Sequence, residues 1–218
     1  MSLGIAALKE QARKRRVFFS FHYQEDIFRL NQIRNSWRFG RENDREGAGF
    51  FDASLWESSQ RKSEDSLKAL IRDGLNNTSV TCVLAGAHTY ARQWVRYEIA
   101  QSVVRGNGLF TVKLDGLVSG GLLGFPSPGG PNPLDYIAIG AGDDGLFYLY
   151  EKKEAGLLSG EQWVPYADYT RSVSLPPSWI SPPIGFVRPL SWYCRLYRYQ
   201  DDFGRLYFGD WADDAALK

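Results

Sequence analysis

Apolar and polar residues follow one another along the first half of the chain in a pattern that predicts strands and helices in turn. The short apolar run from Val17 to His22 fits a strand that is buried on both faces. From Gln24 the apolar residues recur at the helical period, and one side of this predicted helix carries Ile27, Leu30, Ile33 and Trp37.

The same alternation continues as far as residue 114. A second strand is predicted at Gly49–Asp52, and a second helix begins after Ser63 with an inner face formed by Leu67, Leu70, Ile71 and Leu75. Further elements are predicted in chain order as a strand over 79–85, a helix over about 89–105 and a strand over 109–114. Strands and helices that alternate with short links predict a parallel sheet with helices on both faces.

The second half of the chain is less regular. Residues 116–133 are rich in Gly, Pro and Ser and predict a loop, and 135–150 predict a strand and a hairpin around Gly142–Gly145. Residues 166–188 are expected to be irregular, and a last hairpin is expected from strands at 195–199 and 205–208. We therefore expect a basic N-terminal segment (1–15), an α/β domain (16–165) and an aromatic-rich C-terminal extension packed on it (166–218).

Composition narrows the class of protein. A length of 218 residues suits one well-buried domain with an appendage. The net charge of +1 does not indicate a protein that binds nucleic acid or an anionic membrane. The basic run Arg13–Arg16 is interpreted as a solvated helix end. No apolar run resembles a signal peptide or a membrane span, and the two cysteines and two histidines are too scattered for a zinc site. We expect a cytoplasmic protein without a metal.

Glu98 is the strongest chemical signal in the sequence. In the helix over 89–105 the predicted inward stripe contains Trp94, Val95 and Ile99, and Glu98 falls on that stripe. A carboxylate that faces a core is costly to desolvate, and burial raises its pKa. Two explanations remain open, a structural ion pair with an arginine such as Arg34 and a functional carboxylate in a cleft. We favour the second.

The ends of the first two predicted strands supply further polar candidates. Ser20 and His22 share one face of the first strand, and Asp52 ends the second. Together they suggest a hydrolase triad. A nucleophilic serine also needs an oriented base and an oxyanion hole, and the sequence indicates neither. A response-regulator site is disfavoured because Ala85 and Gly86 stand where its aspartate is needed. No glycine-rich phosphate loop follows the first strand.

Several of these segments resemble TIR-type domains. Val17–Tyr23 and Gly49–Asp52 are similar to the first two strand motifs of that family. The likeness is closer to the bacterial TIR-like branch of the ThsB type, from the Thoeris anti-phage system, and it rests on segments 76–84, 92–99 and 130–136. The matches extend over roughly residues 16–136. The resemblance implies a flavodoxin-like fold with an irregular or β-rich C-terminal extension.

The resemblance also implies an activity, namely cleavage of NAD at the nicotinamide–ribose bond and cyclisation to a cyclic ADP-ribose isomer. NAD would be the substrate and no cofactor would be needed. A diffusible nucleotide would activate a separate effector, and self-association through TIR surfaces is a further expectation. The catalytic glutamate of the family corresponds to Glu98. The substrate-binding candidates are Phe19, Ser20, Phe21, His22, Asp52, Trp56 and Trp94.

Two other functions remain as alternatives. The chain could be a catalytically silent interaction module, because a fold does not by itself establish catalysis. A serine hydrolase that uses Ser20 and His22 is the weaker alternative. A cleft beside Glu98 that is wide enough for a nucleotide ribose favours the NAD-cleaving enzyme, whereas a Glu98–arginine pair without a cavity favours the module.

Overall fold

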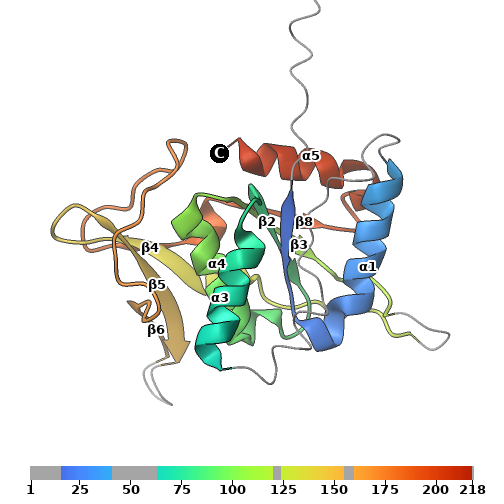
Figure 1. Ribbon diagram of the computed structural model, residues 1–218, viewed down its shortest axis with the longest axis horizontal. Coiled ribbons are helices and arrows are strands. Elements are labelled where there is room, and N and C mark those ends of the chain that lie inside the picture. Colours follow the sequence, from blue (N-terminus) through green and yellow to red (C-terminus); the bar gives the residue numbers. More distant parts are fainter. Residues whose placement is uncertain (1–15, 41–62, 120–123, 155–159, 218) are drawn as a thin grey trace, which may run out of the picture.

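The described part of the chain contains two sheets joined by helix α4. The computed structural model describes residues 16–40, 63–119, 124–154 and 160–217. In these residues a four-stranded parallel sheet has the order β1-β2-β3-β8 and a four-stranded antiparallel sheet has the order β6-β5-β4-β7. Figure 1 shows the parallel sheet between α1, α3, α4 and α5, with the second sheet to one side.

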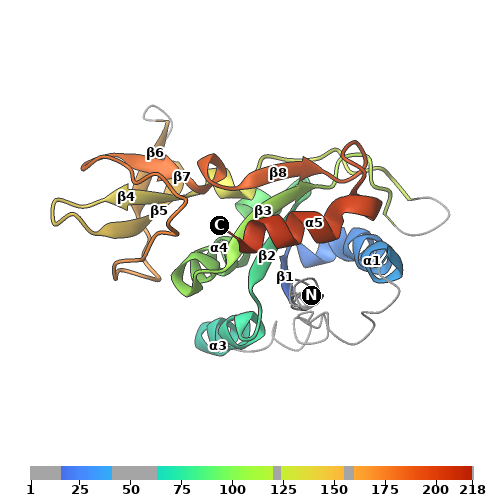
Figure 2. The same cartoon turned by 90° about the horizontal axis from the view of Figure 1, so that it is seen from above.

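The parallel sheet is buried on both faces, as its continuous apolar strands predict. It is formed by β1 (Val17–Ser20), β2 (Val80–Ala85), β3 (Gly108–Lys113) and β8 (Arg195–Arg198). Helices α1 (Tyr23–Gly40) and α5 (Gly204–Ala216) cover one face, and α3 (Glu64–Leu75) and α4 (Gln93–Arg105) cover the other (Figure 2). This arrangement confirms the predicted flavodoxin-like, TIR-like α/β fold.

Local signals in the sequence explain where α3 begins and where α4 ends. The hydroxyl of Ser63 accepts a hydrogen bond from the backbone N–H of Ser66, which caps α3 as predicted. Helix α4 ends at Gly106, whose φ of 74° is a left-handed conformation that glycine adopts without strain. The apolar positions Leu67, Ile71 and Leu75 of α3 then pack on Phe18 and Tyr97.

The helix predicted over 89–105 is broken in the structure. A 3₁₀ turn, η2 (Thr89–Ala91), comes first, Arg92 is extended, and α4 starts only at Gln93. The Thr89 hydroxyl accepts a bond from the N–H of Gly86 and donates to Asp26. These bonds hold the turn against the end of β2 and compete with a continuous helix.

The second sheet holds the predicted hairpin. Strands β4 (Ile137–Ala141) and β5 (Phe147–Glu154) pair on either side of Gly142–Gly145, and β6 (Glu161–Pro165) and β7 (Val187–Pro189) complete the sheet. The 3₁₀ turns η3 (Pro133–Asp135) and η4 (Leu190–Trp192) lie on the links to the rest of the chain. Ile137 and Ile139 share a core with Val95 and Ile99 of α4, so α4 is packed between the two sheets.

The hairpin predicted at the end of the chain is wrong. Residues 195–198 form β8, which pairs in parallel with β3, and residues 204–216 form helix α5. Phe208, Trp211, Ala212 and Ala215 are buried at helical spacing against the parallel sheet. Residues 166–218 therefore supply an edge strand and a covering helix to the parallel sheet.

Some predictions concern residues outside the described ranges. The strand Gly49–Asp52, the candidates Asp52 and Trp56 and the segment 1–15 all lie there. Within the described ranges, no helix is both long and apolar enough to cross a membrane.

Candidate active site

Ser20 and Glu98 meet where the end of β1 passes under α4. Ser20 is the last residue of β1 and is fully buried, and Glu98 is buried with 3% of its surface exposed. The Ser20 hydroxyl donates a hydrogen bond of 2.5 Å to Oε2 of Glu98. The backbone carbonyl of Glu98 accepts a further bond from the Ser102 hydroxyl at 2.7 Å. The predicted inward direction of Glu98 is therefore confirmed.

The buried carboxyl group is strongly perturbed. Burial raises the pKa of Glu98 to about 8, and the hydrogen bond from Ser20 opposes this rise only in part. Among the described residues no arginine pairs with Glu98, and Ser20 is its side-chain partner. The structural ion pair with Arg34 is thus not the arrangement found. A buried carboxyl group that has no oppositely charged partner among the described residues and has a pKa near neutrality is typical of a functional site.

Glu98 opens onto a pocket of about 290 Å³. The pocket lies between the segment after β1 and the start of α4. Its lining residues are Phe21, His22, Tyr23, Gln24, Ala91, Arg92, Gln93, Trp94, Val95 and Glu98. Such a volume is at the lower end for small-molecule sites and suits one half of a dinucleotide. None of the lining residues comes from the range 166–218.

A chain of charged and titratable groups forms one side of this pocket. Nδ1 of His22 lies 3.2 Å from Oε2 of Glu25 and 3.4 Å from Nη2 of Arg92. Nδ1 of His88 lies 3.0 Å from Oε1 of Glu25. Partial burial acts to raise the pKa of Glu25, but hydrogen bonds with His88 and His22 outweigh it and lower the pKa. Glu25 is therefore an anion held between two imidazoles.

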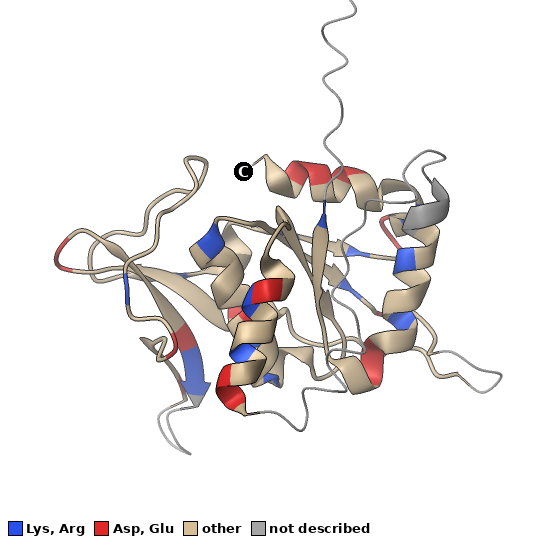
Figure 3. Cartoon of the chain, viewed as in Figure 1, with Lys and Arg blue, Asp and Glu red and all other residues tan. Residues whose placement is uncertain are grey.

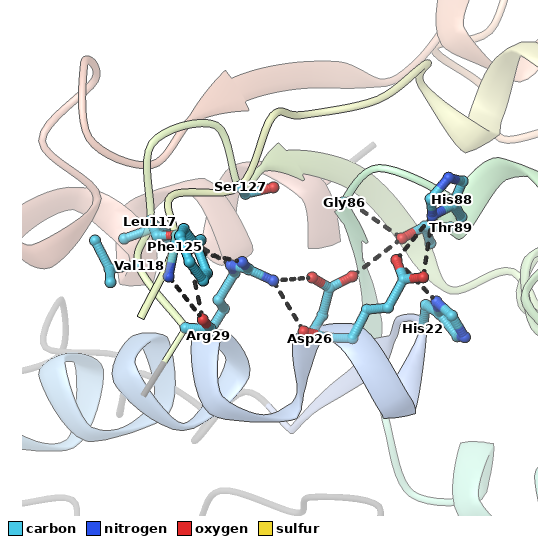
Figure 4. A network of polar contacts seen from close by, with 12 residues as sticks. His22, Asp26, Arg29, Gly86, His88, Thr89, Leu117, Val118, Phe125 and Ser127 are labelled. Atoms are coloured by element: carbon cyan, nitrogen blue, oxygen red, sulfur yellow. Dashed lines mark hydrogen bonds and ion pairs between the residues drawn. The ribbon is translucent and has the colours of Figure 1, made fainter. Parts of the chain in front are cut away.

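A buried ion pair fixes the helix that carries this chain. Figure 4 shows Asp26 and Arg29 of α1 beside the end of β2. Nη1 of Arg29 donates to Oδ1 of Asp26 at 2.9 Å, and its Nε donates to the carbonyl of Leu117 at 2.8 Å. Burial raises the pKa of Asp26, while Arg29 acts in the opposite direction. These bonds lock the start of α1 against two loops and so keep Glu25 and His22 in place.

The structure brings together four of the predicted site residues at this pocket. Phe21, His22, Trp94 and Glu98 line it, and Ser20 is bonded to the carboxyl group. Phe19 lies elsewhere, in the core on the other face of the sheet, where its ring stacks on Phe208 with centroids 5.7 Å apart. Their roles toward a substrate remain predictions.

Sequence analysis missed Arg92 and Glu25. A cation at the start of a helix interacts unfavourably with the helix dipole. The position of Arg92 just before α4 could therefore have indicated that this residue has a function other than stabilising the helix. Glu25 was interpreted only as a favourable first-turn acid, and nothing in the sequence shows that two histidines face it.

The serine hydrolase alternative is not supported by these contacts. The Ser20 hydroxyl donates to a carboxyl group, and Nδ1 of His22 contacts Glu25 and Arg92. Within the described contacts, none joins Ser20 to His22. The described ranges also contain no group of three His, Cys, Asp or Glu side chains placed to hold a metal ion.

Comparison with known proteins identifies the family. Residues 18–119 match the family model for the TIR-like domain of the Thoeris protein ThsB. The chain is also 39% identical over 203 residues to the ThsB1 protein of Bacillus cereus (strain MSX-D12), whose name provisionally assigns it cyclic ADP-D-ribose synthase activity. That alignment covers 91% of this chain and 99% of the relative. The chain belongs to the ThsB family of TIR-like proteins.

The matched region contains all the described lining residues of the pocket of this ThsB-family chain. Residues 18–119 include most of β1 and all of α1, α3, β2, α4 and β3, and therefore both described sides of the pocket and Glu98. The family assignment confirms the resemblance inferred from the sequence motifs. The alignment with the Bacillus relative extends the likeness well beyond the family model.

Proposed function

We propose that this ThsB-family chain cleaves NAD at the bond between nicotinamide and ribose and closes the remaining nucleotide into a cyclic ADP-ribose. The observation that carries the proposal is Glu98, a buried carboxyl group bonded by Ser20 at the inner end of a pocket. The name of the Bacillus relative, a cyclic ADP-D-ribose synthase, supports the same reaction. In this proposal NAD is the substrate and no cofactor takes part.

Glu98 acts on the ribose as the glycosidic bond breaks. Nicotinamide bound to ribose is already a cation, so it leaves as a neutral molecule and needs no general acid. Its departure leaves an oxocarbenium-like ribose, and a carboxylate is the group that glycosidases place beside such a charge. An anionic Glu98 stabilises this charge from a fixed position in a low-dielectric site.

The raised pKa of Glu98 fits a cationic substrate. With a pKa of about 8, the carboxyl group is mostly protonated at pH 7 in the free protein. The positive nicotinamide ring favours the ionised form of a nearby carboxyl group, so binding of the substrate itself promotes loss of the proton. The uncharged ring of the reduced dinucleotide does not supply this driving force.

The product depends on which nucleophile reaches the ribose. Attack by water gives linear ADP-ribose and releases a proton. Attack by another atom of the same dinucleotide closes a ring as the bond to nicotinamide breaks. A hydroxyl group that attacks then loses its proton to solvent, whereas a ring nitrogen takes over the positive charge. A folded substrate holds the two ends close together, which favours the ring when water is kept out.

The proposed biological role follows from this product. A cyclic nucleotide diffuses from the protein and activates a separate effector in anti-phage defence. Because NAD is an intracellular metabolite, the proposed reaction places the protein in the cytoplasm. Self-association through the TIR-like surfaces is part of the proposal, with no role for nucleic acid or a membrane.

The test is incubation of the purified protein with NAD, followed by chromatography of nicotinamide and the nucleotide products. We expect wild-type protein to release nicotinamide and Glu98→Gln to release none. Glu151→Gln is a matched control, because Glu151 is also buried but pairs with Lys153 and with Arg96 and is not among the described lining residues of the pocket. The nucleotide peak separates the cyclic from the linear product.

A negative result is informative when the assay is repeated in extracts of phage-challenged cells. Activity that appears only there identifies an enzyme that awaits a trigger. Absence of nicotinamide release in both settings rejects the proposal and favours the silent interaction module. Equal activity of wild type and Glu98→Gln would instead reject Glu98 as the reacting carboxylate.

A further inference from the structure

We propose that Arg92 binds the phosphate group attached to the nicotinamide ribose, and that the contact of His22 with Glu25 leaves the guanidinium group available to the substrate. This inference rests on the proposed function, because it concerns the same pocket. It assigns the charged end of the pocket to a chemical group of the substrate and adds a residue that the sequence motifs did not single out.

Arg92 is the cation of the pocket lining. The described lining residues include Arg92 and no lysine, and the guanidinium group is exposed to solvent. The first turn of α4 contains no acidic residue that would compensate its charge. A guanidinium group presents paired N–H donors that match the oxygens of a phosphate. The pocket therefore has an anion-binding end at Arg92 and a carboxyl end at Glu98.

The separation of these two ends suits a ribose phosphate. Arg92 and Glu98 are six residues apart on or beside α4, which corresponds to about 9 Å along the helix axis. In the proposed reaction the C1′ carbon of the ribose lies at Glu98. The 5′ oxygen on the opposite side of the ribose carries the phosphate, which then points along the pocket toward the start of α4.

The contacts of His22 show that Arg92 is only loosely held in the free protein. Nδ1 of His22 lies 3.4 Å from Nη2 of Arg92 and 3.2 Å from Oε2 of Glu25. A single ring nitrogen accepts from Arg92 when it is unprotonated and donates to Glu25 when it carries a proton, so it cannot make both bonds at once. When His22 donates to Glu25, the guanidinium group loses this acceptor and is available to an incoming phosphate.

The geometry around Glu25 favours that second state. The carboxylate of Glu25 is held from its other side by His88, with Nδ1 at 3.0 and 3.1 Å from its two oxygens. A carboxylate fixed in this way is a strong acceptor for the N–H of His22. His22 and Glu25 are therefore positioning residues, and Arg92 is the residue that touches the substrate.

The test compares two ligands that differ by a single phosphate, nicotinamide mononucleotide and nicotinamide riboside. Their binding is measured by calorimetry on the full chain carrying Glu98→Gln, in which neither is consumed. We expect the mononucleotide to bind more tightly than the riboside. Adding Arg92→Ala should weaken the mononucleotide by about 10- to 100-fold, the usual size of a lost hydrogen bond to a charged group, and leave the riboside unchanged.

Arg105→Ala is the matched control. Arg105 is an exposed arginine in the last turn of the same helix, so its removal changes the net charge equally and leaves the pocket intact. Both ligands should bind the Arg105→Ala protein as they bind its parent. Arg92→Lys should give an intermediate loss for the mononucleotide, because lysine keeps the charge without the paired donors.

Turnover of NAD provides an independent reading. An anchor remote from the breaking bond contributes equally to the ground state and the transition state, so Arg92→Ala should raise KM by about 10- to 100-fold and change kcat little. The inference would be overturned if Arg92→Ala left the affinity difference between the mononucleotide and the riboside unchanged, including the case in which both ligands lose affinity equally. Neither result would affect the proposal that the protein cleaves NAD. Phosphate-dependent binding through Arg92 without any NAD cleavage would reject the proposed function and keep the inference.

Discussion

Removal of the Ser20 hydroxyl should shift the pH dependence of the reaction toward higher pH. Ser20 donates a 2.5 Å hydrogen bond to Glu98 and lowers a pKa that burial has raised to about 8. A hydrogen bond to a charged group contributes about 1.5–3 kcal/mol, which corresponds to about 1–2 pKa units. Without the hydroxyl, the pKa of Glu98 in the Ser20→Ala protein should therefore rise by about that amount.

The expected effect on the rate depends on pH. The proposed reaction needs ionised Glu98, and a carboxyl group with a pKa of about 8 is only about one-tenth ionised at pH 7. A rise of about 1–2 units lowers this fraction in proportion, so nicotinamide release by Ser20→Ala at pH 7 should fall by about 10- to 100-fold. As the pH increases, the rate of the variant should approach that of the wild type.

The assay is the profile of kcat/KM against pH for nicotinamide release. Because NAD decomposes in alkali, each pH needs a blank without protein. Ser102→Ala is the matched control, since its hydroxyl bonds the backbone carbonyl of Glu98 and the Thr81 hydroxyl and does not contact the carboxyl group. An unchanged inflection in Ser20→Ala, or a rate that falls equally at every pH, would refute the reasoning.

Three further predictions concern stability and can be checked by denaturant unfolding. The pKa of Glu98 is about 8 in the folded protein and has its ordinary value of 4.5 in the unfolded chain. The contribution of Glu98 to the free energy of unfolding is therefore fully present below about pH 4.5 and is lost as the pH rises to 8. The free energy of unfolding of Glu98→Gln should therefore increase relative to that of the wild type by about 3–4 kcal/mol between pH 5 and pH 8. A difference that is constant with pH would contradict this. Gly86→Ala should cost about 3–5 kcal/mol, because its new Cβ would lie 2.2 Å from Oδ2 of Asp26 and disturb the buried pair with Arg29. Gly145→Ala meets no atom within 4 Å and should cost only the strain of alanine at a φ of 76°, about 1–2 kcal/mol. Phe208→Ala should cost about 3–5 kcal/mol through the cavity left against Phe19 and Phe110, and a loss below about 1 kcal/mol would show that α5 is not part of the core.

The first half of the fold could be predicted because its signals are local. The strands at 17–20 and 80–85 are continuous apolar runs, and the helices at 23–40 and 64–75 show the helical period with a cap or an acidic first turn. The direction of Glu98 followed from the same helical projection, since the side that faces the sheet depends only on neighbouring residues.

The second half could not be predicted from local signals alone. Pairing of β8 with β3 joins segments that are far apart in the sequence, and a short strand such as Arg195–Arg198 does not indicate its partner. The error at α5 had a different cause. The apolar residues around Phe208 were interpreted as the end of a hairpin, although the helical period continues through Trp211, Ala212 and Ala215.

Individual residues of the site could be predicted from the sequence, but the contacts between them could not. Glu98, Phe21 and His22 were named from their positions on predicted elements. Their partners could not be found in this way, because Glu25 and Arg92 reach His22 from two different helix starts. The relative placement of such elements depends on tertiary contacts, among them the buried pair of Asp26 and Arg29.

The late position of β8 and α5 in the chain affects the order in which the protein can be built on a ribosome. β1, which carries Ser20, packs on α5 through the contact of Phe19 with Phe208. Helix α5 also carries three acidic residues, Asp210, Asp213 and Asp214 (Figure 3). The nascent chain therefore exposes the part of the sheet's apolar face that α5 covers until α5 emerges from the exit tunnel. We expect the pocket to become competent only after α5 has packed on the sheet, which under the proposed function would protect the cellular NAD pool from chains that have not yet reached α5.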